Sequence, residues 1–432
     1  MKPGEPRPWG RALLLLSLLG PFFFASYGFA TWYASRLLEV PSVVYGWERA
    51  IPLWPWTIVP YWSVDLFYAV SFFICATRAE LRMHAQRLFA AQLISVSFFL
   101  LFPLRFTFER PPLGGLFGGL FAALMEFDKP FNQAPSLHIS LLLILWVRYA
   151  AHLGRFWRVA LHVWFALIGI SVLTTWQHHF IDLPTGFLAG ASCLALFPEH
   201  PGVKQQDRRR FAIAGLYLAG AAIGGLIAFF LSRAEPAAAW LYWPAGSLVL
   251  VAVIYLRGLP GGFGKEGGRI AWPVRVALWP YLAMAFLNSR LWTRREPRPM
   301  EIAEGVWLGR VPAGADLASG GFRSRVDVSA ELPVRTGGLL LTEVPMLDLL
   351  APEPEQLAKA ARAIERLSNL RPTLVHCALG YSRSAAVIAA WLAASGRSPG
   401  GAAAIARVAA AAPRIRLGPR HQAAIERVPP LR

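Results

Sequence analysis

A cysteine and an arginine six positions apart form the strongest chemical signal in the sequence. Cys377 follows a short β-rich run, residues 373–375, and Arg383 comes directly before an alanine-rich run, residues 384–394, that is typical of a helix. A strand, a loop and a helix in this order direct backbone N–H groups and the positive helix end into one concavity, which suits a dianionic phosphate. The same field favours the nucleophilic thiolate, and an arginine fork can hold two phosphoryl oxygens.

The pattern His-Cys-x5-Arg-Ser, which begins at His376, resembles the signature of the cysteine-dependent phosphatases, and Gly-Tyr-Ser-Arg-Ser at its end is most similar to the dual-specificity branch. The resemblance spans roughly residues 301–432 and implies a small α/β domain without a cofactor. It implies that Cys377 takes the phosphoryl group and that Ser384 assists the thiolate as leaving group. The loop implied to bind the phosphate consists of Ala378, Leu379, Gly380, Tyr381, Ser382 and Arg383.

An aspartate about thirty residues before the cysteine protonates the departing oxygen in that family, and Asp348 stands at the matching distance. Asp327, in a strand-like run, is predicted to be structural. Relatives that act on phosphoinositides carry Lys or Arg inside the loop, and here no basic residue separates Cys377 from Arg383. Phosphotyrosine, phosphoserine and simple phosphomonoesters therefore stay open as substrates. The alternative interpretation of Cys377 is a buried structural cysteine.

Three polar clusters interrupt an otherwise apolar part of the chain, around Arg110, between Ser136 and His138, and between His178 and Asp182. Ionisable groups in or beside a membrane are costly and usually functional. His178 and Asp182 are four residues apart, so on a helix they share a face, where the carboxylate can fix the tautomer of the imidazole and raise its basicity. The clusters are predicted to lie on one side of the membrane, opposite the cytoplasm.

In the order Arg-Pro, Pro-Ser-x-His and Ser-x6-His-x3-Asp, these clusters resemble the type 2 phosphatidic acid phosphatase superfamily over about residues 52–197. They are most similar to its branch of inositol-phosphoceramide and sphingomyelin synthase-like proteins. The resemblance implies that no metal takes part. The implied roles are nucleophile for His178, orienting carboxylate for Asp182, acid and base for His138, and phosphate binding for Arg110 and Ser136.

Two positions depart from the superfamily pattern. Pro103 stands where a lysine is expected and Val172 where an arginine is expected, so Arg105 or Lys129 is a candidate replacement for the lost positive charge. Two other interpretations of the histidines stay open. They could pack between membrane helices as hydrogen-bonded polar residues. By ligand type alone, four side chains could also hold a metal: His138, His178, His179 and Asp182.

The composition predicts an integral membrane protein, because 55% of the 432 residues are hydrophobic and only 16% are charged. The net charge of +18 comes from arginines scattered at the ends of apolar runs, which is typical of membrane loops and not of a nucleic-acid-binding tract. Residues 112–125 are predicted to be re-entrant or interfacial. The nine apolar runs are residues 12–34, 56–76, 88–102, 137–150, 157–175, 180–197, 211–231, 237–256 and 276–288.

Basic residues recur in alternate predicted loops, which are assigned to the cytoplasm together with the N-terminus. The last run, residues 276–288, is short and contains Pro280. We therefore favour eight crossings, with the C-terminal domain in the reducing cytoplasm. The loop arginines are Arg78, Arg82, Arg87, Arg148, Arg155, Arg158, Arg208, Arg209, Arg210, Arg257 and Arg269.

The sequence thus predicts an all-α polytopic membrane bundle of eight or nine helices followed by a small α/β cysteine-phosphatase domain, in a bacterial inner membrane. The predicted regions are a phosphatidic acid phosphatase-like domain at residues 1–200, further helices and a linker at 201–295, and the phosphatase-like domain at 296–432. In that domain, strands are predicted at 305–308 and 325–328 and helices at 355–367 and 400–411.

The function predicted from both sites is that of a bifunctional membrane phosphatase. Its expected partners are membrane lipids and a phosphorylated lipid or protein substrate, without nucleic acid. Two alternatives stay open: a lipid headgroup transferase, in which an alcohol resolves the phosphohistidine, and an inactive membrane anchor that localises a cytoplasmic phosphatase.

Overall fold

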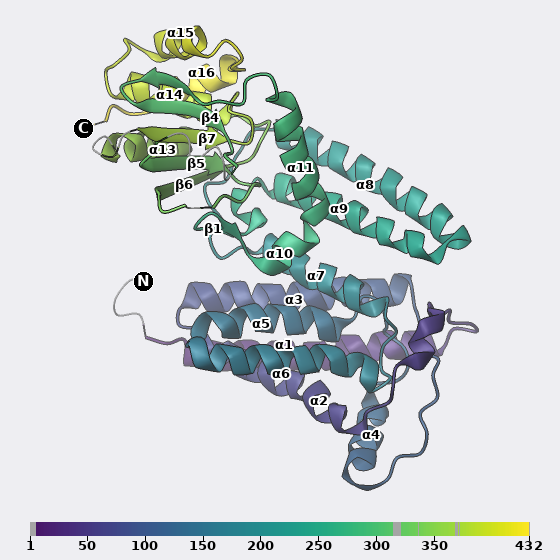
Figure 1. The fold of residues 1–432 in the computed structure, drawn as a ribbon. Coiled ribbons are helices and arrows are strands. Elements are labelled where there is room, and N and C mark those ends of the chain that lie inside the picture. The colour runs from purple at the N-terminus through teal and green to yellow at the C-terminus, as the bar shows by residue number, and fades with distance from the viewer. Residues whose placement is uncertain (1–5, 314–320, 336, 368–369, 371, 432) are drawn as a thin grey trace. The chain divides into compact units, whose positions relative to one another are not determined.

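The computed structural model describes residues 6–313, 321–335, 337–367, 370 and 372–431 (Figure 1). The chain divides into two compact units, Met1–Phe197 and Pro198–Arg432. The first unit is all-helical, and the second combines helices with a five-stranded sheet.

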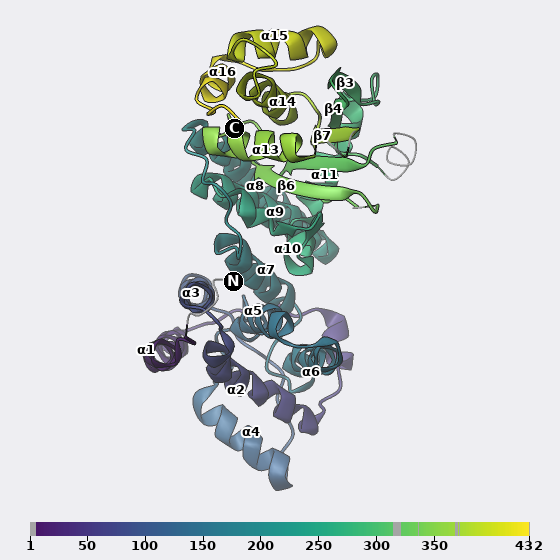
Figure 2. The same ribbon diagram turned by 90° about the vertical axis from the view of Figure 1, so that its left-hand side faces the viewer.

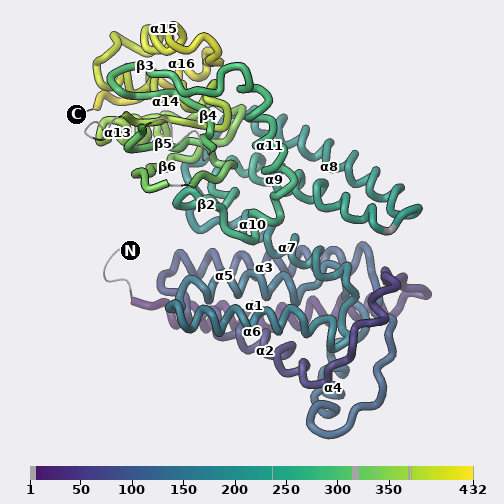
Figure 3. The backbone as a smooth tube through the Cα atoms, in the orientation of Figure 1, coloured from purple at the N-terminus to yellow at the C-terminus, as the bar shows by residue number. Residues whose placement is uncertain are grey.

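The described part of the first unit consists of α-helices and two 3-10 turns, and its path is easiest to follow in Figure 3. Its long apolar segments form helices, in which the backbone N–H and C=O groups are paired within the segment. The elements are α1 (Trp9–Ser35), η1 (Gly46–Ala50), η2 (Pro55–Thr57), α2 (Ile58–Ile74), α3 (Arg78–Leu101), α4 (Gly115–Phe127), α5 (Leu137–His152), α6 (Arg155–Thr174) and α7 (Asp182–Leu196).

Each of the nine predicted apolar runs lies largely within a helix. Among the described residues, five helical segments are long and apolar enough to cross a membrane, which is compatible with a membrane protein. The remaining runs lie in shorter or more polar helices, so the predicted eight crossings stay a prediction. The five segments are Trp9–Ser35, Pro55–Ile74, Arg155–Thr174, Arg209–Ala234 and Ala237–Arg257.

The assignment of several arginines to loops was wrong. Helix α3 begins ten residues before the predicted apolar run, because Thr77 caps it: the Glu80 N–H donates to the Thr77 hydroxyl at 3.2 Å. The Glu80 carboxylate also accepts a hydrogen bond from the Ala76 N–H at 2.6 Å. The Thr-x-x-Glu spacing could have revealed this start. The arginines that lie on helices α3, α5 and α6 are Arg78, Arg82, Arg87, Arg148, Arg155 and Arg158.

Helices α5 and α7 pack closely through small residues. A Cβ atom added at Gly186 would lie 2.5 Å from the carbonyl oxygen of Ser136, and one added at Gly190 would lie 2.8 Å from that of Ser140. The Ser140 hydroxyl donates to the Gly186 carbonyl at 2.9 Å. Small residues on facing helices permit this backbone approach. The contact fixes the start of α5 beside the start of α7, where the Ser136 N–H donates to the Asp182 carbonyl at 3.1 Å.

The second unit begins with helices and continues into an α/β domain. Its helical part contains α8 (Arg209–Ala234), η3 (Pro236–Leu241), α9 (Tyr242–Arg257), η4 (Pro260–Phe263), β1 (Lys265–Glu266), β2 (Arg269–Ile270), α10 (Trp272–Ala277) and α11 (Trp279–Trp292). The α/β part contains β3 (Met300–Ala303), β4 (Val306–Arg310), β5 (Ser324–Ser329), β6 (Leu340–Met346), α13 (Pro354–Arg366), β7 (Thr373–Cys377), α14 (Arg383–Ala394), α15 (Gly401–Ala411) and α16 (Pro419–Glu426).

The sheet has the order β3-β4-β7-β5-β6, and β7 at its centre pairs in parallel with both β4 and β5. All five residues of β7 are buried, as expected for a central parallel strand. Helices α13 and α14 pack against each other and against the sheet, and Figure 2 shows α15 and α16 beyond α14. The predicted strands and helices of this domain are confirmed within one or two residues, and Asp327 lies in β5 as predicted.

Candidate active sites

The predicted phosphate loop connects the central strand β7 to helix α14. The strand ends at Cys377 and the helix begins at Arg383, so the loop lies at the positive end of α14. Gly380 has a φ of +82°, and a Cβ atom there would lie 2.8 Å from the carbonyl carbon and oxygen of Gly309. Only glycine fits this position, because both the backbone conformation and the close approach to β4 exclude a side chain.

The sulfur of Cys377 receives two hydrogen bonds within the loop. The Gly380 N–H donates to Sγ at 3.2 Å, and the Ser384 hydroxyl donates to it at 3.3 Å. The residue is 3% exposed. Cys377 belongs to the hydrophobic core, as a buried structural cysteine would. Its sulfur nevertheless accepts hydrogen bonds from two polar donors. Such donors stabilise a negative charge on sulfur.

Arg383 is fully buried and bidentate to Glu331, a residue to which the sequence analysis gave no role. Its Nη1 and Nη2 donate to the two Glu331 carboxylate oxygens at 2.8 and 2.7 Å, and Nη1 also donates to the Met346 carbonyl at 2.8 Å. Burial alone would raise the pKa of Glu331, but the Arg383 guanidinium lowers it below its usual value. In the described structure, the buried Nε of Arg383 has no hydrogen-bond partner, so this donor is free for an anion.

Asp348 contacts the same guanidinium as Glu331. Its Oδ1 is 3.1 Å from Nη2 of Arg383, and the side chain is partly exposed. Burial raises the pKa of Asp348; the Arg383 charge opposes this shift, and the nearby Glu331 carboxylate adds to it. The next residue, Leu349, has a φ of +60°, so the backbone turns sharply after the aspartate. A carboxyl group with a raised pKa keeps its proton to higher pH, as a general acid requires.

A buried ion pair between Lys265 and Asp327 lies next to His376 of β7. The Lys265 Nζ, from the β1–β2 hairpin, lies 2.5 Å from Oδ2 of Asp327 and 2.9 Å from the Ser329 carbonyl. Burial would raise the pKa of Asp327, but the Lys265 charge lowers it. Burial lowers the pKa of His376 to about 4, so its imidazole is neutral at physiological pH. The signature histidine therefore has a structural position beside Asp327, 3.7 Å away.

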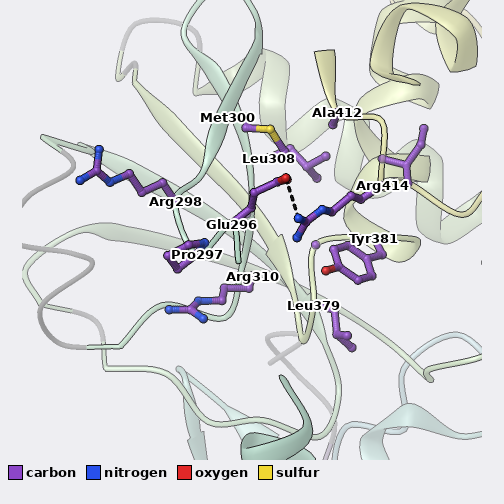
Figure 4. A pocket seen from close by; sticks show the side chains of 13 residues that line it. Glu296, Pro297, Arg298, Met300, Leu308, Arg310, Leu379, Tyr381, Ala412 and Arg414 are labelled. Carbon is purple, nitrogen blue, oxygen red and sulfur yellow. Dashed lines mark hydrogen bonds and ion pairs between the residues drawn. The ribbon is translucent and has the colours of Figure 1, made fainter. Parts of the chain in front are cut away.

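A separate small pocket lies on the other side of the phosphate loop, and Cys377 is not among its lining residues (Figure 4). Gly380 and Tyr381 form one wall, and an ion pair of 2.6 Å between Arg414 and Glu296 crosses it. This pocket therefore contacts the back of the loop and not its concave side.

In the first unit, the structure brings together three of the predicted residues. Nδ1 of His178 is 3.1 Å from Oδ2 of Asp182, and Nε2 of His178 is 3.3 Å from the Ser136 hydroxyl. The same Oδ2 accepts the His179 N–H at 3.0 Å. All three predicted residues are buried. Because Asp182 binds Nδ1, the Nε2 atom is the one directed towards the start of α5.

His138 and Arg110 lie around this group. The His138 ring stacks on Tyr61 with centroids 4.1 Å apart, and in the described structure its buried Nε2 has no hydrogen-bond partner. Nη2 of Arg110 donates to the Trp176 carbonyl at 3.1 Å, two residues before His178. The Lys129 amine, one candidate replacement for the missing lysine, donates to the Met125 carbonyl at 2.8 Å.

Two hydrogen-bonded carboxylates of this unit, the buried Glu48 and the half-buried Asp128, were missed by the sequence analysis. Glu48 accepts from the Phe180 N–H at 3.0 Å and lies 2.9 Å from Nδ1 of His179. The Asp128 carboxylate accepts hydrogen bonds from the hydroxyl groups of Tyr27 and Tyr61 at 2.6 and 3.1 Å. Neither carboxylate lies at a motif spacing. Among the described residues, no group of three His, Cys, Asp or Glu side chains is arranged to hold a metal ion.

Comparisons with known proteins concern the C-terminal part. Residues 316–397 match the family Tc-R-P, described as "Polymorphic toxin system, DSP-PTPase phosphatase". The chain is similar to the solved structures of Tk-PTP in the active form (27% identity, TM-score 0.28), of a mouse putative dual specificity phosphatase complexed with zinc tungstate (27%, 0.27) and of human DUSP28 (28%, 0.26). Each alignment covers 30% of this chain and, respectively, 95%, 84% and 90% of the solved chain. A search of the curated proteins finds no match.

Proposed function

We propose, from the dual-specificity phosphatase-like character of the C-terminal domain, that the chain hydrolyses phosphate monoesters at Cys377 through a phosphocysteine. The observation that carries the proposal is the pair of hydrogen bonds that Sγ receives from the Gly380 N–H and the Ser384 hydroxyl. Hydrogen-bond donors of this kind stabilise a thiolate, which is the nucleophilic form of cysteine.

In the first step, Sγ attacks phosphorus, the S–P bond forms, and the bond from phosphorus to the ester oxygen breaks. Asp348 gives its proton to the departing alkoxide, so a neutral alcohol leaves. The backbone N–H groups of the loop and the free Nε–H of Arg383 donate hydrogen bonds to the equatorial oxygens of the phosphoryl group. Glu331 holds the rest of the guanidinium in place.

In the second step, water attacks phosphorus and the P–S bond breaks, which releases inorganic phosphate and the Cys377 thiolate. Asp348, now deprotonated, takes the proton of the attacking water. The Ser384 hydroxyl, 3.3 Å from Sγ, stabilises the negative charge that returns to sulfur. Two displacements thus replace one more difficult displacement.

A second activity is proposed for the first unit, where the arrangement of His178, Asp182 and Ser136 favours hydrolysis of lipid phosphate esters. Nε2 of His178 would attack phosphorus, because Nδ1 is held by Asp182. His138 would give its proton to the leaving oxygen and then take one from the water that resolves the phosphohistidine. A lipid substrate suits this unit because the bilayer holds the tails and leaves the phosphate at the helix ends.

Purified full-length protein, with the variants Cys377→Ser and His178→Ala side by side, tests both activities. We expect Cys377→Ser to lose turnover of water-soluble phosphomonoesters. We expect the turnover of lipid phosphates that remains in Cys377→Ser to be lost when His178→Ala is added. Free phosphate released from phosphatidic acid indicates a hydrolase, whereas a new headgroup lipid without free phosphate indicates a transferase. In the Cys377→Ser background, lipid turnover that is absent, or that His178→Ala leaves unchanged, would leave the first unit as an anchor for the cysteine phosphatase.

The membrane arrangement is part of the proposal. We propose a multi-pass protein of a bacterial inner membrane with a cytoplasmic C-terminal domain. The five apolar helices of spanning length are compatible with the membrane location, and the orientation follows the rule that basic residues stay on the cytoplasmic side. Labelling of a cysteine introduced after Pro430 with a membrane-impermeant reagent tests this orientation. Labelling in intact spheroplasts contradicts it, and labelling only in inverted vesicles supports it.

A further inference from the structure

Helices of the second unit bind directly to both catalytic loops. The Ser289 hydroxyl, on α11, donates to the carbonyl of Ala378 in the phosphate loop at 2.6 Å. The Tyr255 hydroxyl, in the last turn of α9, donates to the carbonyl of Asp348 at 3.1 Å. One contact therefore holds the loop of the nucleophile and the other holds the loop of the general acid.

Further contacts extend this attachment. The Tyr381 hydroxyl donates to the Trp292 carbonyl at the end of α11 at 3.0 Å. The Leu347 N–H, next to the general acid, donates to the side chain of Gln205 just before α8 at 2.6 Å. Ala285 of α11 packs on a small apolar cluster that includes Ala378. Figure 1 shows α11 and the end of α9 beside the edge of the sheet where β4 and β7 end.

Three tyrosines from these helices form a common aromatic cluster. The Tyr217 ring, on α8, lies 5.6 Å from that of Tyr255 and 5.9 Å from that of Tyr281, between ring centroids. Near this cluster, Cys377 is 3% exposed and Arg383 is 1% exposed. Helix α9 thus contacts the loop of the general acid and α11 contacts the phosphate loop, while α8 packs on both helices through Tyr217. These helices occupy surface beside the catalytic loops that a large folded substrate would need to approach.

The covering helices have the properties of a membrane hairpin. Segments Arg209–Ala234 and Ala237–Arg257 are two of the five helices apolar and long enough to span, and arginines lie at the end where the catalytic loops attach. The side chains on the outside are apolar and exposed, such as Leu216 at 74% and Phe230 at 64%. On α11, Trp279, Met284 and Trp292 are also exposed, and tryptophan is typical of a membrane interface.

We propose that the cysteine site acts on the phosphate monoester of a membrane lipid, whose headgroup reaches Cys377 alongside α9 and α11 while its tails stay in the bilayer. The inference rests on the proposed phosphatase activity and names its substrate class. The loop between Cys377 and Arg383 contains no basic residue, so it fits a headgroup with one phosphate better than a polyphosphorylated one. A phosphoprotein is the competing substrate, and the covered loops disfavour it.

The test uses full-length protein carrying His178→Ala, so that the histidine site makes no contribution. Three probes are compared: phosphatidic acid in phosphatidylcholine vesicles, a phosphotyrosine peptide, and p-nitrophenyl phosphate. We expect kcat/KM for the vesicle lipid to exceed that for the peptide by about 100-fold. Addition of Cys377→Ser must abolish the lipid turnover.

The outcomes separate the inference from the proposed function. Turnover of p-nitrophenyl phosphate together with equal or better turnover of the peptide than of the lipid overturns the inference and leaves the phosphatase activity in place. Lipid turnover that persists in the double variant overturns it as well. Absence of turnover with all three probes contradicts the proposed function itself, and the inference with it.

A surface variant gives a second measurement that does not depend on the catalytic residues. Met284→Glu places a charge on the exposed apolar face of α11, which should lower the ratio of lipid to p-nitrophenyl phosphate turnover by about 10-fold. Leu340→Glu, at an exposed apolar residue on β6, is the matched control and should leave that ratio unchanged. An unchanged ratio in Met284→Glu, or an equal fall in both variants, contradicts entry of the lipid alongside α11.

Discussion

The two candidate sites of this chain are built in opposite ways. The cysteine site comes mainly from eight consecutive residues, Cys377 to Ser384, on one strand, one loop and one helix. The histidine site combines Arg110, Ser136 and His178 from three separate loops or helix starts. Local backbone geometry is enough to form the nucleophile and the phosphate loop of the first site, whereas the second site exists only if α5 and α7 pack as Gly186 and Gly190 permit.

The sites also differ in how they hold their arginines. Arg383 is buried and fixed by Glu331, with Nε left without a partner in the described structure. Arg110 instead donates to the Trp176 carbonyl. A phosphate at the cysteine site meets a preorganised cation, whereas a phosphate at the histidine site must compete with a backbone acceptor. The variants below test this contrast, in order of decreasing effect.

The largest effect is expected for Cys377→Ser, because a serine hydroxyl at this position lacks the reactivity of the thiolate. Turnover of p-nitrophenyl phosphate should fall by roughly 10⁵-fold, as for the loss of a covalent nucleophile in general. Release of p-nitrophenol by the purified protein measures it. Cys75→Ser is the matched control, since Cys75 is also a buried cysteine and lies in the first unit. Equal losses in both variants would assign the effect to folding.

His178→Ala should lower the release of phosphate from phosphatidic acid at the first unit by about 10³ to 10⁴-fold, measured in the Cys377→Ser background. The loss should be smaller than that at the cysteine site, because the less preorganised arginine gives the histidine site a lower starting rate. His162→Ala, at an exposed histidine of α6, should have no comparable effect. If His178→Ala in the Cys377→Ser background releases as much phosphate as Cys377→Ser alone, the histidine site is inactive.

The site built from consecutive residues could be predicted from the sequence more completely than the site built from separate segments. The strand, loop and helix around Cys377 were predicted within one or two residues, because their signals lie within a short segment. Glu331 was missed, since its partner Arg383 is distant in sequence and no spacing links the two. In the first unit, Glu48 and Asp128 were missed for the same reason. The start of α3 was also missed, although it had a local signal: the N-cap residue Thr77 with Glu80 three positions later.

Asp348→Asn should reduce turnover of an alkyl phosphate by about 10²-fold, because the alkoxide then leaves without a proton. For p-nitrophenyl phosphate the loss should be small, since p-nitrophenolate leaves unaided, and this substrate is the internal control. Burial raises the pKa of Asp348, so the protonated acid persists to higher pH. In the parent, kcat/KM for the alkyl phosphate should fall as pH rises through that pKa, and the variant should lack this fall. Equal losses for both substrates contradict the acid role.

The smallest effect is expected for Ser384→Ala, which removes one hydroxyl donor 3.3 Å from Sγ. A hydrogen bond to a charged group contributes roughly 1.5–3 kcal/mol, and the length of 3.3 Å favours the lower end of this range, so the second step should slow by about 10-fold. Since the first step does not release charge onto sulfur, the phosphocysteine should accumulate and a burst of p-nitrophenol should precede the slower steady state. Ser395→Ala, at the other end of α14, is the control and should give no burst. A uniform slowing without a burst would place the hydroxyl in the first step, where it would act on the attacking thiolate.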